Sequence, residues 1–173
     1  MDNIVLHKPW ISLWLTIGIP GAGKSRWVKK FKEENPKAFV ISTDDLRKSL
    51  TGVEQCINPA QNGMIHEEAR KRVKEIIDSP WNGEPCDLSR KIVVDSTNCS
   101  VDEWRAYRNL GADWMHAVVF ERSPEQAMEN QKHRERQVPL EVVKMKWNEY
   151  EHDKSLLPFF FNQLSFIPFD TSS

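Results

Sequence analysis

The sequence predicts an α/β fold with a mostly parallel sheet flanked by helices, and three observations carry this prediction. Short β-branched runs alternate with longer stretches of helical periodicity, an order typical of strands joined by crossover helices. A glycine-rich break over Gly18–Gly23 separates the first apolar run from the first helical stretch. The length of 173 residues suits one domain, since domains commonly have about 100–200 residues. We therefore expect a single domain over residues 1–173.

The first two elements flank the glycine-rich break. Trp10–Ile17 is an apolar, β-branched run and is predicted to be a strand. Lys24–Glu34 continues with helical spacing and stops before Asn35-Pro36, a sequence that terminates helices.

The next elements lead away from this first unit and return to it. Ala38–Ser42 is predicted to be a second strand, and Thr43 is predicted to cap a short helix that runs to about Leu50. Residues 51–60 contain glycine and proline and are predicted to be a loop. Gln61–Asp78 then shows the apolar spacing of a longer helix.

The central part of the chain repeats the pattern of strand and helix. Ser79–Arg90 is rich in proline and glycine and is predicted to be a surface connection. Lys91–Asp95 is the third predicted strand. Val101–Leu110 is predicted to be a helix closed by Gly111, and Trp114–Glu121 is the fourth predicted strand.

Two prolines in the last part of the chain indicate where helices begin, because proline suits the first turn of a helix. The predicted elements are a helix from Pro124 to about His133, a polar, cationic segment over 132–138, a helix from Pro139 to about His152, and an edge strand over Leu164–Phe169.

Composition excludes several classes of protein. The 24 Lys and Arg residues balance 25 Asp and Glu residues, for a formal charge of −1, so a polybasic nucleic-acid coat protein is excluded. No run approaches the ~18 apolar residues that a membrane span needs, and the acidic start Met1-Asp2-Asn3 is unlike a signal peptide. Cysteines 56, 86 and 99 form no CxxC pair, which favours reduced thiols and a cytoplasmic location.

The glycine-rich break is a phosphate-binding motif. Gly18–Ser25 satisfies G-x-x-x-x-G-K-[ST], with a strand before it and a helix after it. Glycines let successive N–H groups point inward as an anion nest, and the helix N-terminus favours the same charge. Lys24 can span the β- and γ-phosphates of ATP, and the Ser25 hydroxyl can ligate Mg²⁺. The candidate donor-binding residues are Gly18, Gly21, Ala22, Gly23, Lys24, Ser25 and Arg26.

The motif does not by itself identify the reaction. No [NT]-K-x-D element of a GTPase is present, and motor ATPases of the AAA type usually need a longer chain. Small kinases remain, in which a second substrate supplies the nucleophile. The chain therefore has to provide an acceptor site.

An acceptor site is predicted directly after the second strand. Ligands of open α/β sheets bind beyond the carboxyl ends of the strands, so Asp44, Asp45 and Arg47 are expected to face the same crevice as the phosphate loop. Asp44 is the candidate general base, which would take the proton of the acceptor hydroxyl. Arg47 lies three residues farther on, where its guanidinium could hold a phosphate or carboxylate. The simpler alternative is that the two aspartates only favour a helix start, and for Asp45 we adopt it.

Several short motifs outside the loop occur together in one known family. They are Leu15-Thr16-Ile17-Gly18, Pro20-Gly21, Gly23-Lys24-Ser25, Trp27, Phe31, Asn35-Pro36, Asp44-Asp45, Arg47, Ser49, Asp95-Ser96-Thr97-Asn98, Asn130 and Val138-Pro139. On these residues, roughly over 11–150, the chain resembles the kinase module of phage-type 5′-polynucleotide kinases. The resemblance implies a single-domain P-loop kinase fold that transfers phosphate to a nucleic-acid end, and a host-cytoplasmic location for a phage-encoded protein.

The resemblance also assigns roles to residues. It implies that Asp44 is the general base and that Arg47 grips the phosphate on the 3′ side of the acceptor nucleotide. It implies a basic lid at about 132–138, in which Arg134 and Arg136 clamp the transferring group. Two positions depart from the family pattern. Arg26 replaces a small hydroxyl residue after the loop serine, and His133 stands where an arginine is expected.

Weaker signals have alternative interpretations. Asp95 ends the third strand and could support Mg²⁺ indirectly, or could be a plain strand-end carboxylate. Thr97 and Asn98 could touch the acceptor, but we favour a role as caps of the helix that starts near Val101. For Trp27 we favour packing over base stacking.

The sequence thus predicts a Mg²⁺-dependent transfer of the γ-phosphoryl group of ATP to the 5′-hydroxyl of a DNA or RNA end. The nearest alternative is a P-loop kinase for a small metabolite, a nucleoside or a tRNA-linked group. A second alternative, from another class, is a nucleotide-binding module without catalytic activity.

Overall fold

Five strands form one parallel sheet in the computed structural model, in the order β2-β3-β1-β4-β5. The structure describes residues 8–53, 59–80 and 88–169. The strands are β1 (Trp10–Ile17), β2 (Phe39–Ser42), β3 (Ser89–Asp95), β4 (Trp114–Val119) and β5 (Gln163–Phe166). The α/β fold with a mostly parallel sheet is therefore confirmed, as is the predicted edge strand near the C-terminus.

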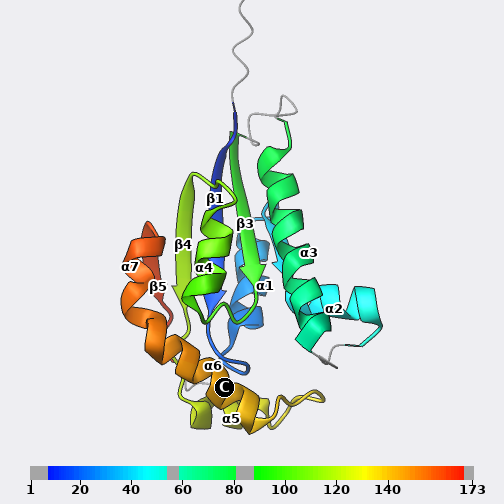
Figure 1. Cartoon of the computed structure of the whole chain (residues 1–173), viewed down its shortest axis with the longest axis vertical. Helices are drawn as coiled ribbons and strands as arrows, with labels where there is room; N and C mark the ends of the chain where they lie inside the picture. Colours follow the sequence, from blue (N-terminus) through cyan, green and yellow to red (C-terminus); the bar gives the residue numbers. More distant parts are fainter. Residues whose placement is uncertain (1–7, 54–58, 81–87, 170–173) are drawn as a thin grey trace, which may run out of the picture.

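Helices cover both faces of this sheet (Figure 1). They are α1 (Lys24–Glu34), α2 (Thr43–Thr51), α3 (Pro59–Asp78), α4 (Val101–Arg108), α5 (Pro124–Gln131), α6 (Leu140–Asp153), the 3₁₀ turn η2 (Lys154–Leu156) and α7 (Leu157–Phe160). In Figure 1, α4 lies in front of the sheet and α1 behind it. The arrows of β1, β3 and β4 point toward the end that carries α2, α5 and the segment between α5 and α6, and β2 and β5 run parallel to them.

The alternation of side chains along β3 shows how the two faces are packed. Ile92 and Val94 belong to the larger hydrophobic cluster, which also contains residues of α3, α4 and α6. Val93, between them, packs with Val28 and Phe31 of α1 in a second cluster. A strand buried on both faces has a continuous apolar sequence, which is why β1 and β3 were recognisable from sequence.

The parallel register brings the ends of three strands together. Leu15 of β1 lies opposite Val94 of β3, and Ser42 of β2 lies opposite Asp95. The phosphate loop after β1, the start of α2 after β2 and the carboxylate that ends β3 consequently share one edge of the sheet. This is the edge at which open α/β sheets bind ligands.

Helix caps differ from two predictions. The N-cap of α2 is Ser42, whose Oγ accepts a hydrogen bond from Asp45 N at 3.3 Å, and Thr43 is already helical. Thr43 instead places its Oγ1 3.1 Å from Ser96 Oγ, so its hydroxyl links the start of α2 to the residue that follows β3. The prediction of Thr43 as cap was wrong because adjacent serine and threonine are both competent caps.

The cap of α4 was also misplaced. Ser100 caps this helix in a reciprocal capping box with Glu103, so the prediction of Thr97 and Asn98 as caps was wrong. The Asn98 Nδ2 donates to Thr16 O at 2.9 Å and ties the turn after β3 to β1. When several neighbouring residues can cap a helix, the backbone conformation decides which of them does so. Asn98 has a positive φ of 44°, whereas the observed cap Ser100 is extended.

Some predictions concern residues outside the described ranges. These are Met1-Asp2-Asn3, Cys56, Cys86 and the middle of the loops predicted over 51–60 and 79–90. Both loops are shorter than predicted, because α3 already begins at Pro59 and β3 at Ser89. Cys99 is a free, buried thiol, and Trp27 packs against Phe31 with ring centroids 5.1 Å apart. Within the described ranges, no helix is both long and apolar enough to cross a membrane.

Candidate active site

The phosphate loop is fixed to its surroundings by close backbone contacts. Gly18 N donates to Thr97 O at 3.0 Å, and Asn130 Nδ2 of α5 donates to Gly21 O at 3.0 Å. Gly21 has a φ of +87°, and a Cβ there would collide with the carbonyl oxygen of Ala127. Glycine is therefore required at Gly21 for both conformation and space. These contacts hold the loop in a defined shape between β1, β3 and α5.

Lys24 lies inside the loop rather than in solvent. The residue is 9% exposed, and its Nζ donates to Ile19 O at 2.8 Å. Burial lowers the pKa of Lys24, while the charges of Asp95 and Asp44 act in the opposite direction. A buried ammonium gains strongly from an anion placed beside it. The loop thus presents a shielded cation at the position where the motif predicts donor phosphates.

Ser25 and Asp95 meet at the start of α1. The Ser25 Oγ donates to Asp95 Oδ2 at 3.0 Å. Burial raises the pKa of Asp95, and both the charge of Lys24 and the Ser25 hydrogen bond counteract that effect. A hydroxyl and a carboxylate are hard oxygen ligands, and Mg²⁺ in phosphate sites usually takes one or two protein ligands with the remainder from phosphates and water. The pair fits a Mg²⁺ ion held together with donor phosphates.

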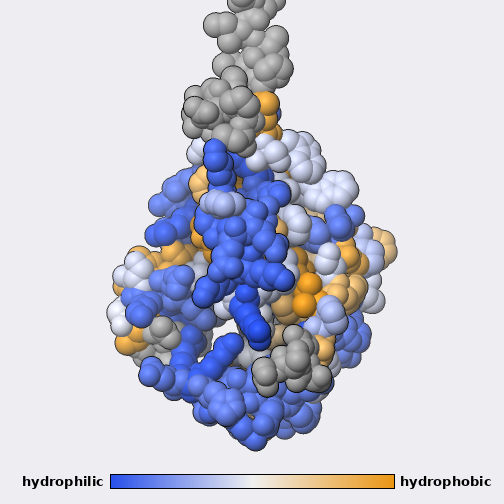
Figure 2. Space-filling view, turned by 180° about the vertical axis from the view of Figure 1, so that it is seen from behind, coloured by the Kyte–Doolittle hydropathy of each residue, from blue (hydrophilic) through white to orange (hydrophobic). Residues whose placement is uncertain are grey.

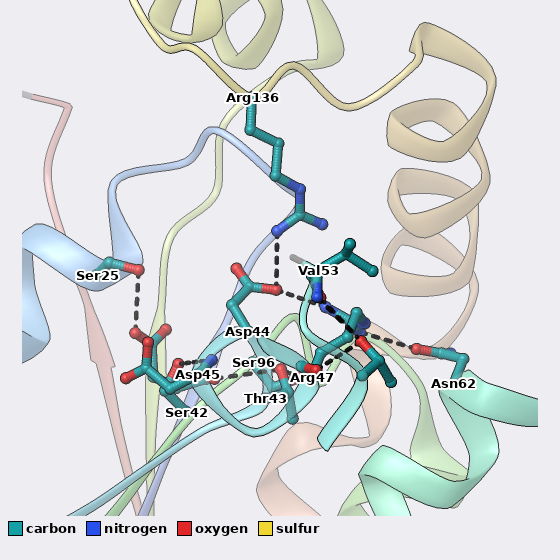
Figure 3. A network of polar contacts seen from close by, with 12 residues as sticks. Ser25, Ser42, Thr43, Asp44, Asp45, Arg47, Val53, Asn62, Ser96 and Arg136 are labelled. Carbon is teal, nitrogen blue, oxygen red and sulfur yellow. Dashed lines mark hydrogen bonds and ion pairs between the residues drawn. The ribbon is translucent and has the colours of Figure 1, made fainter. Parts of the chain in front are cut away.

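Asp44 lies at the N-terminus of α2 between two arginines (Figure 3). Arg47 Nη1 is 2.7 Å from Asp44 Oδ1, and Arg136 Nη1 is 3.1 Å from the same oxygen. The Asp44 side chain is exposed, whereas the Arg47 side chain is 7% exposed. The structure therefore brings together the predicted base, the predicted acceptor-binding arginine and one predicted lid arginine.

Sequence reasoning missed a partner of Arg47. Arg47 Nη2 donates to Asn62 Oδ1 of α3 at 3.0 Å, so the guanidinium joins α2 to α3 (Figure 3). Asn62 lies in the first turn of α3, which begins at Pro59, and the apolar helical pattern follows it. Nothing in that pattern distinguishes Asn62 from an ordinary polar residue of the first helical turn.

The side chains of Asp45 and Asp44 have different surroundings, although the two residues are neighbours in sequence. Asp45 lines a surface hollow together with Ser49 and Arg72, and its backbone N–H is bonded to the cap Ser42. A carboxylate in the first turn of a helix is favoured by the helix dipole. This placement agrees with the structural role that the sequence favoured for Asp45.

The predicted lid is the segment between α5 and α6. Its ends are joined by Gln131, a buried residue whose Oε1 accepts from Val138 N at 2.7 Å. Arg136 contacts Asp44, and the charge of Arg134 is close enough to Lys24 to lower its pKa. In Figure 2 this end of the molecule is hollowed and its rim is mainly hydrophilic. Both lid arginines thus lie near residues of the phosphate loop or of α2.

Two other residues singled out by sequence are exposed. Arg26 follows Ser25 on the first turn of α1, and His133 lies in the lid segment. Both side chains therefore lie at the surface.

Comparison with known proteins places this arrangement in a family. A family model described as an AAA domain (AAA_33) matches residues 13–152. NEDD4-binding protein 2 of Homo sapiens is 30% identical over 108 residues, which are 62% of this chain and 6% of that protein.

Solved structures show the same fold. A chain from the Pnkp1/Rnl/Hen1 RNA repair complex has a TM-score of 0.66 and 16% identity, with 90% of this chain and 48% of that chain covered. A gluconokinase from Sinorhizobium meliloti 1021 has a TM-score of 0.60 and 14% identity, with 93% and 82% covered. The chain thus spans about half of the RNA repair chain and a small part of the human protein. These likenesses give the fold of P-loop kinases.

Proposed function

The chain belongs to the AAA_33 family of AAA domains and has the fold of P-loop kinases, and from this premise we propose that it phosphorylates the 5′-hydroxyl of a DNA or RNA end. The donor is ATP, whose γ-phosphoryl group is transferred. The observation that carries the proposal is the Asp44–Arg47 pair, because it sets a carboxylate and a shielded guanidinium side by side at the edge of the phosphate loop.

On the donor side, the loop N–H groups and Lys24 neutralise the phosphates of ATP. Ser25, with Asp95 beside it, holds Mg²⁺. The metal, when bound, withdraws charge from the phosphate oxygens. Arg134 and Arg136 close over the transferring group as parts of a lid at about 132–138, and Arg26 lies next to the α-phosphate end of the loop.

On the acceptor side, Asp44 accepts the proton of the 5′-hydroxyl while the new oxygen–phosphorus bond forms. The bond between the γ-phosphorus and the bridging oxygen breaks, and ADP leaves. Arg47 contacts the phosphate on the 3′ side of the acceptor nucleotide, for which paired guanidinium donors are well suited. Asn62 holds that guanidinium in place through the 3.0 Å hydrogen bond.

A small-molecule kinase is the second candidate, because the same fold is similar to that of a gluconokinase over 93% of this chain. The buried Arg47 favours an anionic acceptor over a neutral polyol or nucleoside, because its guanidinium suits a phosphate or a carboxylate. A nucleotide chain supplies a 3′ phosphate and gluconate supplies a carboxylate, so the assay has to separate these two anions.

The test offers labelled ATP to thymidine, thymidine 3′-monophosphate and gluconate in parallel. We expect thymidine 3′-monophosphate to have a KM at least about tenfold below that of thymidine, the lower end for one charge-assisted hydrogen bond. Arg47→Ala should remove this preference and leave ATP affinity unchanged, while Lys48→Ala, the exposed neighbour, should retain it. Equal use of thymidine and its 3′-phosphate, or preferred use of gluconate, would contradict the proposal.

A further inference from the structure

The last turn of α5 packs against the phosphate loop. Asn130 Nδ2 donates to Gly21 O at 3.0 Å, and a Cβ at Gly21 would lie 2.9 Å from Gln131 Cγ. The side chain of Gln131 is therefore in direct contact with the loop. Gln131 is 2% exposed, although glutamine is mostly found at protein surfaces. Its burial beside the donor-binding loop needs a reason.

Gln131 also holds the lid segment at two places. Its main-chain oxygen accepts a hydrogen bond from Arg134 N at 2.9 Å, and its side-chain Oε1 accepts from Val138 N at 2.7 Å. The second bond closes residues 131–138 into a compact loop whose two ends meet at one side chain. Surface loops of about 6–16 residues with adjoining ends are frequently functional.

The loop that Gln131 closes carries Arg136 to the site. Arg136 Nη1 lies 3.1 Å from Asp44 Oδ1 (Figure 3). Arg136 stands midway between the two anchored residues, Arg134 and Val138. The ion pair of Arg136 with the exposed Asp44 contributes little by itself. The backbone that carries Arg136 is thus held in place mainly by the two hydrogen bonds to Gln131.

The other contacts of the Gln131 side chain are weaker than its bond to the lid. Its Nε2 lies 3.5 Å from Met128 Sδ, and a thioether sulfur is a weak acceptor. Its stem contacts Gly21 through carbon. An unbranched apolar side chain of similar length could fill the same space and keep that contact. The feature that requires glutamine here is the oxygen that binds Val138 N–H.

We propose that Gln131 is a positioning residue, which sets Arg136 of the lid at a fixed place relative to the phosphate loop. The proposal rests on the proposed function and deepens it, because it names the side chain that aligns the lid with the donor site. Gln131 touches neither donor nor acceptor. It acts through Arg136, whose guanidinium meets the transferring group. A misplacement of about 1 Å can lower a rate ~10²-fold, so a residue without contact to the substrates can still matter for turnover.

Gln131→Met tests the proposal, because methionine has a similar length and offers no oxygen to Val138 N–H. With labelled ATP and thymidine 3′-monophosphate, we expect kcat to fall by about tenfold to ~10²-fold, while the KM of ATP changes less than about threefold. Such a split indicates loss of an interaction that is made only in the transition state. Gln163→Met is the matched control, because it makes the same substitution at an exposed position of β5 and should retain kcat.

A double-mutant cycle shows whether Gln131 acts through the lid arginine. In the background of Arg136→Ala, Gln131→Met should lower kcat less than about twofold further, because no guanidinium is left to misplace. A general loss of folded protein would lower kcat by the same factor in both backgrounds. Equal factors in the two backgrounds would therefore overturn the proposal.

Limited trypsin digestion reports on the lid without turnover. Trypsin cleaves after Lys132, Arg134 and Arg136, and Gln131→Met leaves all three in place. Without ATP, cleavage within 132–137 should be about two- to tenfold faster in Gln131→Met, the factor that one hydrogen bond is worth. Cleavage that stays confined to this segment shows that the remainder of the chain is folded.

A second variant removes the same hydrogen bond from its other side. Val138→Pro lacks the donating N–H and leaves Gln131 unchanged, so it should reproduce both the fall in kcat and the faster cleavage of the lid. If Gln131→Met is cleaved throughout the chain, Val138→Pro carries the test. An unchanged kcat in Val138→Pro would then overturn the positioning role.

The outcomes separate this role from the proposed function. An unchanged kcat in a folded Gln131→Met overturns the positioning role and leaves the kinase assignment intact. If the wild type phosphorylates none of the offered acceptors, the proposed function fails, and the trypsin arm decides on Gln131. Equal cleavage of the lid in the wild type and in Gln131→Met then overturns the positioning role as well, whereas faster cleavage in the variant supports it.

Discussion

Replacing Lys24 by methionine tests donor binding separately from folding. The ammonium is buried and is hydrogen-bonded to Ile19 O at 2.8 Å, and burial lowers its pKa. Methionine retains an unbranched side chain and removes the charge. Exchange of a buried charge for an apolar group of similar volume is often close to neutral, so we expect the free energy of unfolding without ligand to change by less than about 1.5 kcal/mol.

The effect of ATP on stability should change much more. A ligand at a hundred times its Kd stabilises a protein by about 2.7 kcal/mol, which raises the Tm of a chain of this size by about 5–10 °C. Loss of charge-assisted hydrogen bonds to two phosphates, about 1.5–3 kcal/mol each, would weaken Kd more than a hundredfold. The ATP-dependent shift in Lys24→Met should then fall below about 2 °C at the same ATP concentration.

Thermal melting with and without Mg²⁺ and ATP measures this difference, and turnover is followed with labelled ATP. Turnover should fall by at least ~10³-fold, since transition-state cations in phosphoryl transfer are worth that much. Lys29→Met is the matched control, because Lys29 lies on the same helix and is exposed. A full ATP shift in Lys24→Met, or turnover above about a tenth of the wild type where ~10³-fold is expected, would refute the assignment of Lys24 to the donor phosphates.

The remaining predictions concern the base, the lid and a buried histidine. Asp44→Asn should lower kcat by ~10²–10⁴-fold, while Asp45→Asn, which changes a helix-start carboxylate, should alter kcat less than threefold; equal losses would remove Asp44 from the role of base. Trypsin cleavage within 132–137 should slow when Mg²⁺ and ATP are added, because phosphates order a polar segment that has few apolar anchors, and unchanged cleavage would indicate a fixed surface. Burial lowers the pKa of His116 to about 4 from 6.5, so the folded state excludes a proton that the unfolded chain binds. The free energy of unfolding should therefore decrease as pH falls below about 6.5, and this residue should account for a loss of about 3 kcal/mol at pH 4. Urea unfolding of His116→Gln should show a smaller loss over the same pH range. An identical pH dependence in the variant would contradict the assignment of this loss to His116.

The parts of the fold that follow from local rules were predictable. The boundaries of β1 and α1 agree with the prediction because the glycine-rich motif lies between them and fixes where the strand ends and the helix begins. The helix predicted to end at about His133 instead ends at Gln131. There the buried Gln131 side chain bonds Val138 N across the lid segment. That contact depends on the position of a residue seven places farther along the chain, which helical periodicity does not describe.

In the candidate site too, some features follow from local sequence rules and others depend on residues far away in the sequence. Lys24, Ser25, Asp44 and Arg47 could be selected as candidates from sequence because each has a fixed place relative to a strand end. The contacts of Arg47 with Asn62 and of Asp44 with Arg136 join elements that are 15 and 92 residues apart in sequence. Such pairs depend on how α2, α3 and the lid segment pack, and a single sequence carries no direct signal of that packing.

The geometry at Asp44 has a consequence for the order of events in catalysis. Both arginines contact Oδ1 of Asp44, so these ion pairs orient one carboxylate oxygen, and in the proposed reaction Oδ2 accepts the proton of the acceptor hydroxyl. Arg47 is buried and is also held by Asn62, so it can keep Oδ1 oriented during the proposed reaction. Arg136 is 26% exposed and lies on the lid segment, so its contact with the exposed Asp44 is weak and donor phosphates can compete for it. The lid arginine would then leave the base for the donor when ATP binds, and the carboxylate would keep its orientation through Arg47 at the moment it takes the proton.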